Sequence, residues 1–275
     1  MSMDDDIIFV TAYKDIRRNE WNLFPRTTDD YIHYFYILAD SIEYTLVVYV
    51  EQVILEKLLN EHTFRDNIIF KNLNDVDTFY NKFLDKEREI MNSESYKNKI
   101  PESRKYYPEH IYPEYTLINH SKINFIRHTK GEMPNYKYYA WIDFGIAQLD
   151  NGSKEANIEN MPTDIAIEKL SENHIVYHCV NEPPTERRTE DEMVASYDVY
   201  FLGSYFIVPK LLVENFESIW YSKLIKWQEN GICDDDQNLI LQIYYDIPQL
   251  FCKLCIHPLS RANWLQMFRA LRRTK

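Results

Sequence analysis

Two acidic segments of the sequence contain residues that could do chemistry. The first is Tyr138 to Gly145 (YYAWIDFG), an aromatic run that ends in the carboxylate of Asp143. A carboxylate at the end of a buried strand lies where open α/β sheets bind ligands, and its oxygens suit a hard divalent cation. The pairing of Asp143 with Gly145 is also typical of a simple turn at the end of a strand. The residues alone leave both interpretations open.

The second segment is the triplet Asp234, Asp235 and Asp236, followed by Gln237. Apolar residues recur at helical spacing from Leu239 to Ile247, so the triplet is expected at a helix N-terminus, where carboxylates are stabilised. One Asp is explained as a helix cap. A functional interpretation of the rest is a general base that takes the proton of an acceptor hydroxyl, with neighbours that orient it or contact the acceptor. A purely structural role stays open.

A late histidine is a third candidate. His257 follows the apolar run from Leu250 to Ile256, and its neutral imidazole would complement Asp143 around Mn²⁺. A single His is more often structural. Cys252 and Cys255 precede it in a CxxC spacing, but no second Cys pair or further His follows at ligand spacing, so we do not expect zinc.

Composition excludes several classes of function. The chain has only five Gly, and it contains neither GxGxxG nor GxxxxGK[ST], so Rossmann dinucleotide binding and P-loop chemistry are not expected. The net charge of -12 argues against nucleic acid as a partner. Four Cys in 275 residues make no disulfide framework, and no long apolar stretch or signal peptide is visible. We therefore expect a soluble, cytoplasmic protein.

Apolar runs alternate with amphipathic stretches, which predicts an α/β fold with a mostly parallel sheet between helices. Strands are predicted at Ile7 to Ala12, Leu46 to Val50, Asn67 to Phe70 and Tyr138 to Asp143. The intervening positions must form the helices that connect parallel strands.

Helices are predicted after the cap Thr27, with a stripe from Val76 to Leu84, and over Tyr115 to Ile126. A further helix begins at Pro209 and ends at Gly231.

Two segments are predicted to be loops. Met91 to Pro113 is interrupted by prolines and is expected to be an exposed, irregular connection. Asn181 to Asp191 is a charged loop that could act as a lid.

Three segments together resemble a known family. The opening IIFVTAYKDIRRNEW, the central YYAWIDFG and the late GICDDDQNLILQIYYDIPQLF, in this order and spacing, resemble the HtrL/YibB family, which is related to GT-A glycosyltransferases. The resemblance implies one GT-A-like domain over residues 1–275. Residues 1–145 would bind the nucleotide sugar, residues 146–258 would form the acceptor and catalytic half, and residues 259–275 would form a basic amphipathic helix.

The resemblance also implies a reaction. A sugar would pass from a nucleotide-diphosphate-sugar donor to a glycan or another hydroxyl acceptor, with the diphosphate bridged to the protein by Mn²⁺ or Mg²⁺. Asp143 matches the first position of the DxD metal motif, while Gly145 stands at its third position. His257 and the diphosphate oxygens would complete the metal site.

The resemblance places donor residues along the first strand and beside the metal motif. Thr11, Ala12 and Tyr13 would lie next to the nucleoside, with Tyr13 stacking on the base and Asp15 meeting ribose or uracil edges. Lys122 would meet phosphate or ribose oxygens. Packing at the end of a strand is the alternative for Tyr13, and a solvated helix position is the alternative for Lys122.

Acceptor and catalytic residues are implied later in the chain. Gly203 would line the acceptor side of the donor sugar, with a β-bulge as the alternative. Asp235 is favoured over Asp236 as the base of an inverting transfer, and Asp234 and Gln237 would contact the acceptor. A retaining mechanism stays open.

The sequence leaves two other interpretations open. The chain could be a nucleotide-sugar-binding or interaction protein without turnover. The Gly at position 145, where the metal motif has an acid, supports this interpretation. The C-terminal stripe could touch an anionic membrane, although packing of the stripe against the domain is favoured. This stripe consists of Trp264, Met267, Phe268 and Leu271 within a basic segment. No motif specifies an oligomeric state.

Overall fold

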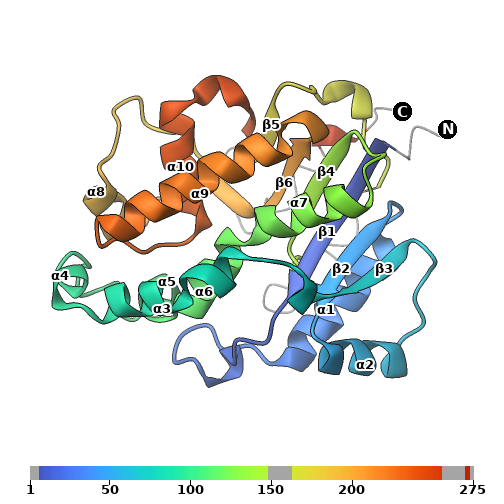
Figure 1. The fold of residues 1–275 in the computed structure, drawn as a ribbon, viewed down its shortest axis with the longest axis horizontal. Coiled ribbons are helices and arrows are strands. Elements are labelled where there is room, and N and C mark those ends of the chain that lie inside the picture. Colours follow the sequence, from blue (N-terminus) through green and yellow to red (C-terminus); the bar gives the residue numbers. More distant parts are fainter. Residues whose placement is uncertain (1–5, 148–162, 256–269, 273–275) are drawn as a thin grey trace.

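The computed structural model describes residues 6–147, 163–255 and 270–272. These residues form a seven-stranded sheet with the order β3-β2-β1-β4-β6-β5-β7 (Figure 1). The strand β6 pairs antiparallel with β4 and β5, and every other pair is parallel. The strands are β1 (Ile7–Tyr13), β2 (Leu46–Val50), β3 (Ile68–Asn72), β4 (Tyr138–Ile142), β5 (Ile175–Cys179), β6 (Phe201–Pro209) and β7 (Phe251–Cys255).

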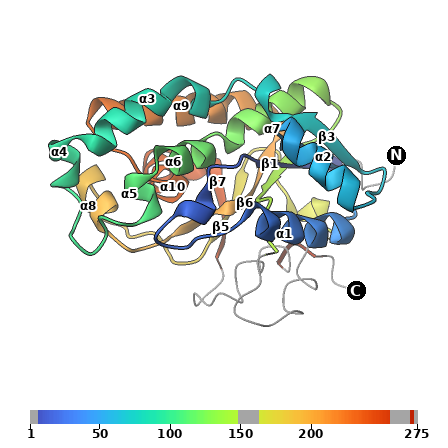
Figure 2. The same cartoon turned by 90° about the horizontal axis from the view of Figure 1, so that it is seen from below.

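Helices cover both faces of the sheet, and α1 lies on the face opposite α7 and α9 (Figure 2). Alternate side chains of β1 enter two separate hydrophobic clusters, because neighbouring residues of a strand point to opposite faces. The helices are α1 (Thr28–Ser41), α2 (Gln52–Glu61), α3 (Phe79–Asn92), α4 (Glu94–Lys97), α5 (Pro108–Ile111), α6 (Pro113–His120), α7 (Lys122–Glu132), α8 (Glu190–Ala195), α9 (Val213–Glu229) and α10 (Asp236–Asp246).

The predicted fold class, an α/β fold with a mostly parallel sheet between helices, is confirmed. All residues of β1, β2 and β4 except Ala12 are buried, as expected for strands covered on both faces. Thr27 caps α1 through a capping box with Asp30, and Gly231 follows the end of α9 with a φ of 66°. Among the described residues, no helix is both long and apolar enough to cross a membrane.

Two of the predicted helices have other boundaries in the structure. The helix expected over Tyr115 to Ile126 is two helices, α6 and α7, which meet at Ser121. The reason is tertiary: the Ser121 hydroxyl accepts the N–H of Tyr80 at 2.9 Å, so the junction caps the start of α3. Pro209 ends β6, and α9 begins only at Val213, after a 3₁₀ turn.

The segment from Met91 to Pro113 is not merely an exposed connection. It contains α4 and α5, and it buries Tyr96, Arg104 and His110. The Tyr96 hydroxyl donates to the carbonyl of Cys233 at 2.7 Å, just before the acidic triplet. This segment therefore supports the turn that carries the predicted catalytic residues.

Two further predictions concern the later part of the chain. In the charged loop, Arg187 pairs with Asp246 on α10, and the role as a lid stays a prediction. In the C-terminal stripe, Leu271 is buried, and Arg272 forms a β-bridge with Ile165, as the packing interpretation expects. The remaining residues of the stripe lie outside the described residues.

Candidate functional site

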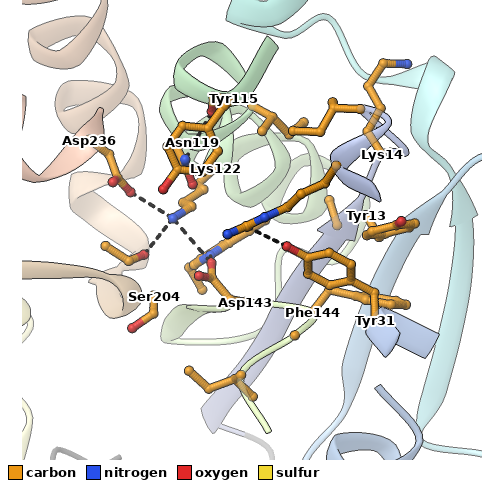
Figure 3. A pocket seen from close by; sticks show the side chains of 18 of the residues that line it. Tyr13, Lys14, Tyr31, Tyr115, Asn119, Lys122, Asp143, Phe144, Ser204 and Asp236 are labelled. Atoms are coloured by element: carbon orange, nitrogen blue, oxygen red, sulfur yellow. Dashed lines mark hydrogen bonds and ion pairs between the residues drawn. The ribbon is translucent and has the colours of Figure 1, made fainter. Parts of the chain in front are cut away.

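A cavity of about 250 Å³ lies at the edge of the sheet where β1 and β4 end and β6 begins (Figure 3). Parallel strands bring their carboxyl ends to one edge, and the antiparallel β6 brings its first residues there. The N-termini of α7 and α10 complete the wall. The predicted site residues that line this cavity are Ala12, Tyr13, Lys122, Asp143, Gly145, Gly203, Asp236 and Gln237.

Lys122 joins the two acidic segments. Its Nζ lies 2.8 Å from Oδ2 of Asp236, 3.3 Å from Oδ1 of Asp143 and 3.0 Å from the carbonyl oxygen of Gly203 (Figure 3). Burial alone would lower the pKa of Lys122, but the two carboxylates outweigh burial and raise it. The cavity therefore holds a fixed ammonium group between two carboxylates that are far apart in the sequence.

The backbone and side chain of Asp143 are both held. Its N–H donates to the carbonyl of Ser204 on β6 at 2.9 Å, and its Oδ1 accepts the indole N–H of Trp141 at 2.7 Å. The next residue, Phe144, stacks on Tyr13 with ring centroids 5.0 Å apart. Asp143 thus has a defined orientation toward the cavity before any ligand binds.

The three acids of the triplet have three different environments. Asp234 accepts the side-chain amide of Asn238 at 2.7 Å, and Asp235 is the N-cap of α10, accepting the N–H of Gln237 at 3.0 Å. Asp236 lines the cavity, whereas Asp234 and Asp235 do not.

Burial also changes the acidity of the triplet. It raises the pKa of Asp234 to about 7, with nearby Glu109 adding to the effect. Burial raises the pKa of Asp235 well above its usual range, and the neighbouring acids Asp234 and Asp236 add to the rise.

Gly203 allows the closest approach in the site. A Cβ at this position would lie 2.0 Å from Oδ2 of Asp236, so a side chain there would displace the carboxylate. The register between β5 and β6 shifts between Tyr177 and His178, opposite this stretch, which agrees with the alternative prediction of a β-bulge. The role of Gly203 on the acceptor side stays a prediction. The bulge and the close approach occur together.

The described residues contain no complete set of protein ligands for a divalent metal. Within residues 6–147, 163–255 and 270–272, no three His, Cys, Asp or Glu side chains gather as ligands. Oδ1 of Asp143 already contacts Lys122 and Trp141. At Gly145, a Cβ would lie 2.9 Å from ring carbons of Tyr31, so the ring fills the space of the second motif acid. His257 lies outside the described residues, and its role stays a prediction.

Three other predicted donor residues are placed as follows. Thr11 is buried in β1 and does not line the cavity. Asp15 also lies off the cavity, where its carboxylate accepts the Arg17 N–H at 2.8 Å and the Thr28 hydroxyl at 2.9 Å. Tyr13 lines the cavity, and its hydroxyl donates to Thr28 at 3.2 Å. The packing interpretation of Tyr13 agrees with these contacts, and base stacking stays a prediction.

Several lining residues are not predicted from the sequence, among them Lys14, Arg18, Arg26, Tyr31 and Ser204. The cations lie in the segment between β1 and α1 and could have been found as positive charge next to an expected phosphate. Ser204 gives no signal in the sequence, because its position depends on the β6 bulge. Its hydroxyl oxygen is buried and has no hydrogen-bond partner among the described residues.

Comparisons with known proteins agree with the resemblance. Residues 5–273 match the family described as "Bacterial protein of unknown function (HtrL_YibB)". The protein HtrL of Escherichia coli strain K12 is 23% identical over 278 residues, which cover 98% of this chain and 94% of HtrL.

Two solved structures are similar at 11% sequence identity. One is a glycosyltransferase involved in the glycosylation of the major capsid of PBCV-1, with a TM-score of 0.40 over 97% of this chain and 90% of that chain. The other is the 4-diphosphocytidyl-2C-methyl-D-erythritol synthase of Anaerococcus prevotii, with a TM-score of 0.41 over 97% and 98%. Likeness at this level carries no argument about activity. The family match, in contrast, spans nearly the whole chain, and the protein therefore belongs to the HtrL/YibB family.

Proposed function

We propose that the protein is a glycosyltransferase, which moves a sugar from a nucleotide-diphosphate-sugar donor to a hydroxyl acceptor. The observation that carries this proposal is the cavity in which Asp143 and Asp236 converge on Lys122 at the carboxyl edge of the sheet. Group transfer from a diphosphate needs positive charge near the leaving group and a carboxylate near the attacking hydroxyl. This cavity is lined by cationic side chains and by the carboxylates of Asp143 and Asp236.

The reaction can be assigned to residues of the cavity. The acceptor oxygen forms a bond to the anomeric carbon while the bond from that carbon to the diphosphate oxygen breaks. The electron pair of the broken bond leaves with the nucleoside diphosphate, and the acceptor proton goes to Asp236. Inversion of the sugar follows from this assignment, because Asp236 acts as a base and not as a nucleophile. No step of this proposal is assigned to a divalent metal.

Asp236 takes the place that the sequence analysis gave to Asp235. The Asp235 carboxylate holds the first turn of α10 and lies off the cavity, whereas Asp236 lines it beside Gly203. Lys122 fixes the Asp236 carboxylate and is therefore a positioning residue.

The matched variants Asp236→Asn and Asp235→Asn test this assignment. Nucleotide release would be measured with UDP-, GDP- and CMP-sugars and a panel of hydroxyl acceptors. We expect Asp236→Asn to slow release by roughly 10²–10⁴-fold, the usual contribution of a general base. Asp235→Asn should keep most of the turnover, because Asn also caps helices well.

The control is the thermal unfolding of both variants. Loss of turnover in Asp235→Asn alone, with both variants folded, would return the base to Asp235. Tight binding of a nucleotide sugar with no release in any acceptor mixture would instead support a binding protein without turnover.

A further inference from the structure

Arg18 and Arg26 stand out among the cations of the cavity, because neither forms an ion pair with any carboxylate of the described residues. Both line the cavity, and both belong to the segment between β1 and α1. The other two lining cations are neutralised: Lys14 pairs with Glu51 at 2.9 Å, and Lys122 pairs with Asp143 and Asp236. The free positive charge of this cavity therefore lies on the two guanidinium groups.

The arginine side chains make hydrogen bonds and ring contacts, but no ion pairs among the described residues. Nη1 of Arg18 donates to the hydroxyl of Tyr31 at 2.7 Å, a bond drawn as the dashed line to the labelled Tyr31 in Figure 3. Its Nε donates to the carbonyl of Phe24 at 3.1 Å. Its guanidinium also lies 5.0 Å from the centre of the Trp21 ring. The Arg26 guanidinium lies 6.0 Å from the centre of the Tyr31 ring, and the Arg26 N–H donates to the Arg18 carbonyl at 3.4 Å.

Tyr31 links these cations to the missing metal motif. Its ring occupies the space beside Gly145, where a second metal-binding acid was expected, and the same ring supports Arg18 and Arg26. The ring in the space of the expected second acid thus contacts two guanidinium groups. The chain carries a net charge of -12, so a diphosphate needs such a local positive site in order to bind.

A second feature also indicates a ligand. Ser204 is only 8% exposed, lines the same cavity, and has a hydroxyl oxygen with no partner among the described residues. A buried hydroxyl without a partner costs stability unless a ligand or water satisfies it. Its O–H can donate to an oxygen of a bound anion.

We propose that Arg18 and Arg26 bind the donor diphosphate directly, so that donor binding needs no divalent cation. The guanidinium group is always charged, and its planar fork of N–H donors fits two phosphate oxygens at once. The identity of the anion as a nucleotide-sugar diphosphate rests on the proposed function. The cation-independent binding of a diphosphate does not depend on it.

Titration calorimetry in EDTA tests the inference, with inorganic pyrophosphate, UDP and GDP as probes. We expect the wild-type protein to bind at least one of them in EDTA, and added Mn²⁺ to change the Kd by less than about threefold. Arg18→Gln and Arg26→Gln should each weaken binding roughly tenfold or more, the usual loss of a charge-assisted hydrogen-bonding partner. Arg18→Lys should recover only part of the loss, because Lys keeps the charge without the fork.

Arg17→Gln is the matched control. Arg17 precedes Arg18, its side chain is 78% exposed and pairs with Glu20, and it does not line the cavity. This variant should bind like the wild type. An equal loss in Arg17→Gln would show only a general charge effect and would overturn the inference.

Other outcomes separate the inference from the proposed function. Binding that appears only with Mn²⁺, or no binding of any probe, would overturn the inference. Sugar transfer that requires Mn²⁺ would also overturn the inference, but it would support the proposed function. Pyrophosphate binding in EDTA through Arg18, together with no turnover of any nucleotide sugar, would support the anion site and remove the transferase. Thermal unfolding checks that each variant folds. If Arg18→Gln does not fold, Arg18→Lys and the salt dependence of the wild-type Kd test the inference instead.

Discussion

Glu87 on α3 is a carboxyl group with no exposed surface. Its side chain accepts the Thr116 hydroxyl at 3.0 Å and the Gln228 amide at 2.7 Å, and no cation of the described residues pairs with it. Burial raises its pKa to about 7, although both hydrogen bonds act to lower it. The folded protein therefore favours the protonated form of Glu87.

This pKa shift makes a prediction about stability. A carboxyl whose pKa is higher in the folded state stabilises the fold below its unfolded pKa of 4.5, and the contribution is lost as the pH rises through about 7. The loss amounts to about 3 kcal/mol. The pKa of buried His110 falls to about 3 and that of His120 to about 4, mainly through burial, so they act in the opposite direction below pH 6.5.

The opposing histidines require a difference measurement. Urea unfolding of Glu87→Gln and of the wild type, at about pH 4.5 and about pH 8, should show the variant gaining about 3 kcal/mol relative to the wild type as the pH rises. A relative stability that stays constant across this range would contradict the shift of Glu87.

The sequence predicted the roles of single residues only in part. Asp143 and Lys122 were both predicted at a donor site, and they do meet. The sequence could not predict which Asp of the triplet lines the cavity. The residue at which α10 begins decides which Asp is the N-cap and which Asp faces the cavity. The free guanidinium groups were missed because charge pairing depends on side chains from distant elements.

At the scale of elements, β6 does most to shape the cavity. Its antiparallel direction brings Gly203 and Ser204 to the edge where β4 ends, and its bulge lets Gly203 meet Asp236. Periodicity in the sequence predicted the strands that begin the sheet, since continuous apolar runs are typical of buried parallel strands. It did not separate α6 from α7, because the break at Ser121 depends on capping a third helix.

Gly203→Ala tests the role of the bulge. The new Cβ would lie 2.0 Å from Oδ2 of Asp236, so the carboxylate must move and its bond to Lys122 must lengthen. We expect a loss of sugar transfer of roughly 10²-fold, as for other small misplacements of reacting groups. Transfer assays of the folded variant check this outcome.

Gly131→Ala is the matched control for that variant. Gly131 lies in α7, and a Cβ there would meet nothing within 4 Å. Alanine should leave transfer unchanged and raise the unfolding free energy by about 0.5–1 kcal/mol, because it favours the helix. A similar loss of transfer in both variants would remove the special role of Gly203.

At the scale of the whole molecule, the described C-terminal residues 270–272 pack on the face of the sheet that α1 covers. Leu271 is 2% exposed within the same hydrophobic cluster as Phe35, and its carbonyl accepts the Ala166 N–H at 2.6 Å. The fold class and the first strands followed from hydrophobic pattern alone, but this closure joins positions about a hundred residues apart. No local pattern encodes such a contact.

Leu271→Ala should lower the unfolding free energy by about 2–4 kcal/mol, because it leaves a cavity in a packed cluster. Leu211→Ala is the control, since Leu211 is 72% exposed and its truncation should cost no more than about 0.5 kcal/mol. Chemical unfolding compares the two. Equal effects would mean that Leu271 does not stabilise the domain, and the membrane interpretation of the C-terminal stripe would gain support.

The buried phenols of the sheet have an optical consequence. Burial raises the pKa of Tyr49 and of Tyr139 to about 12, and that of Tyr177 and of Tyr205 well above the ordinary value. These side chains keep their protons in the folded protein at a pH where an unfolded chain would already absorb light as tyrosinate. With 22 Tyr in the chain, the ultraviolet absorbance in alkali should therefore rise in two stages, first from the exposed rings and then, abruptly, when the sheet opens. The absorbance of the buried Tyr side chains therefore reports when the core unfolds.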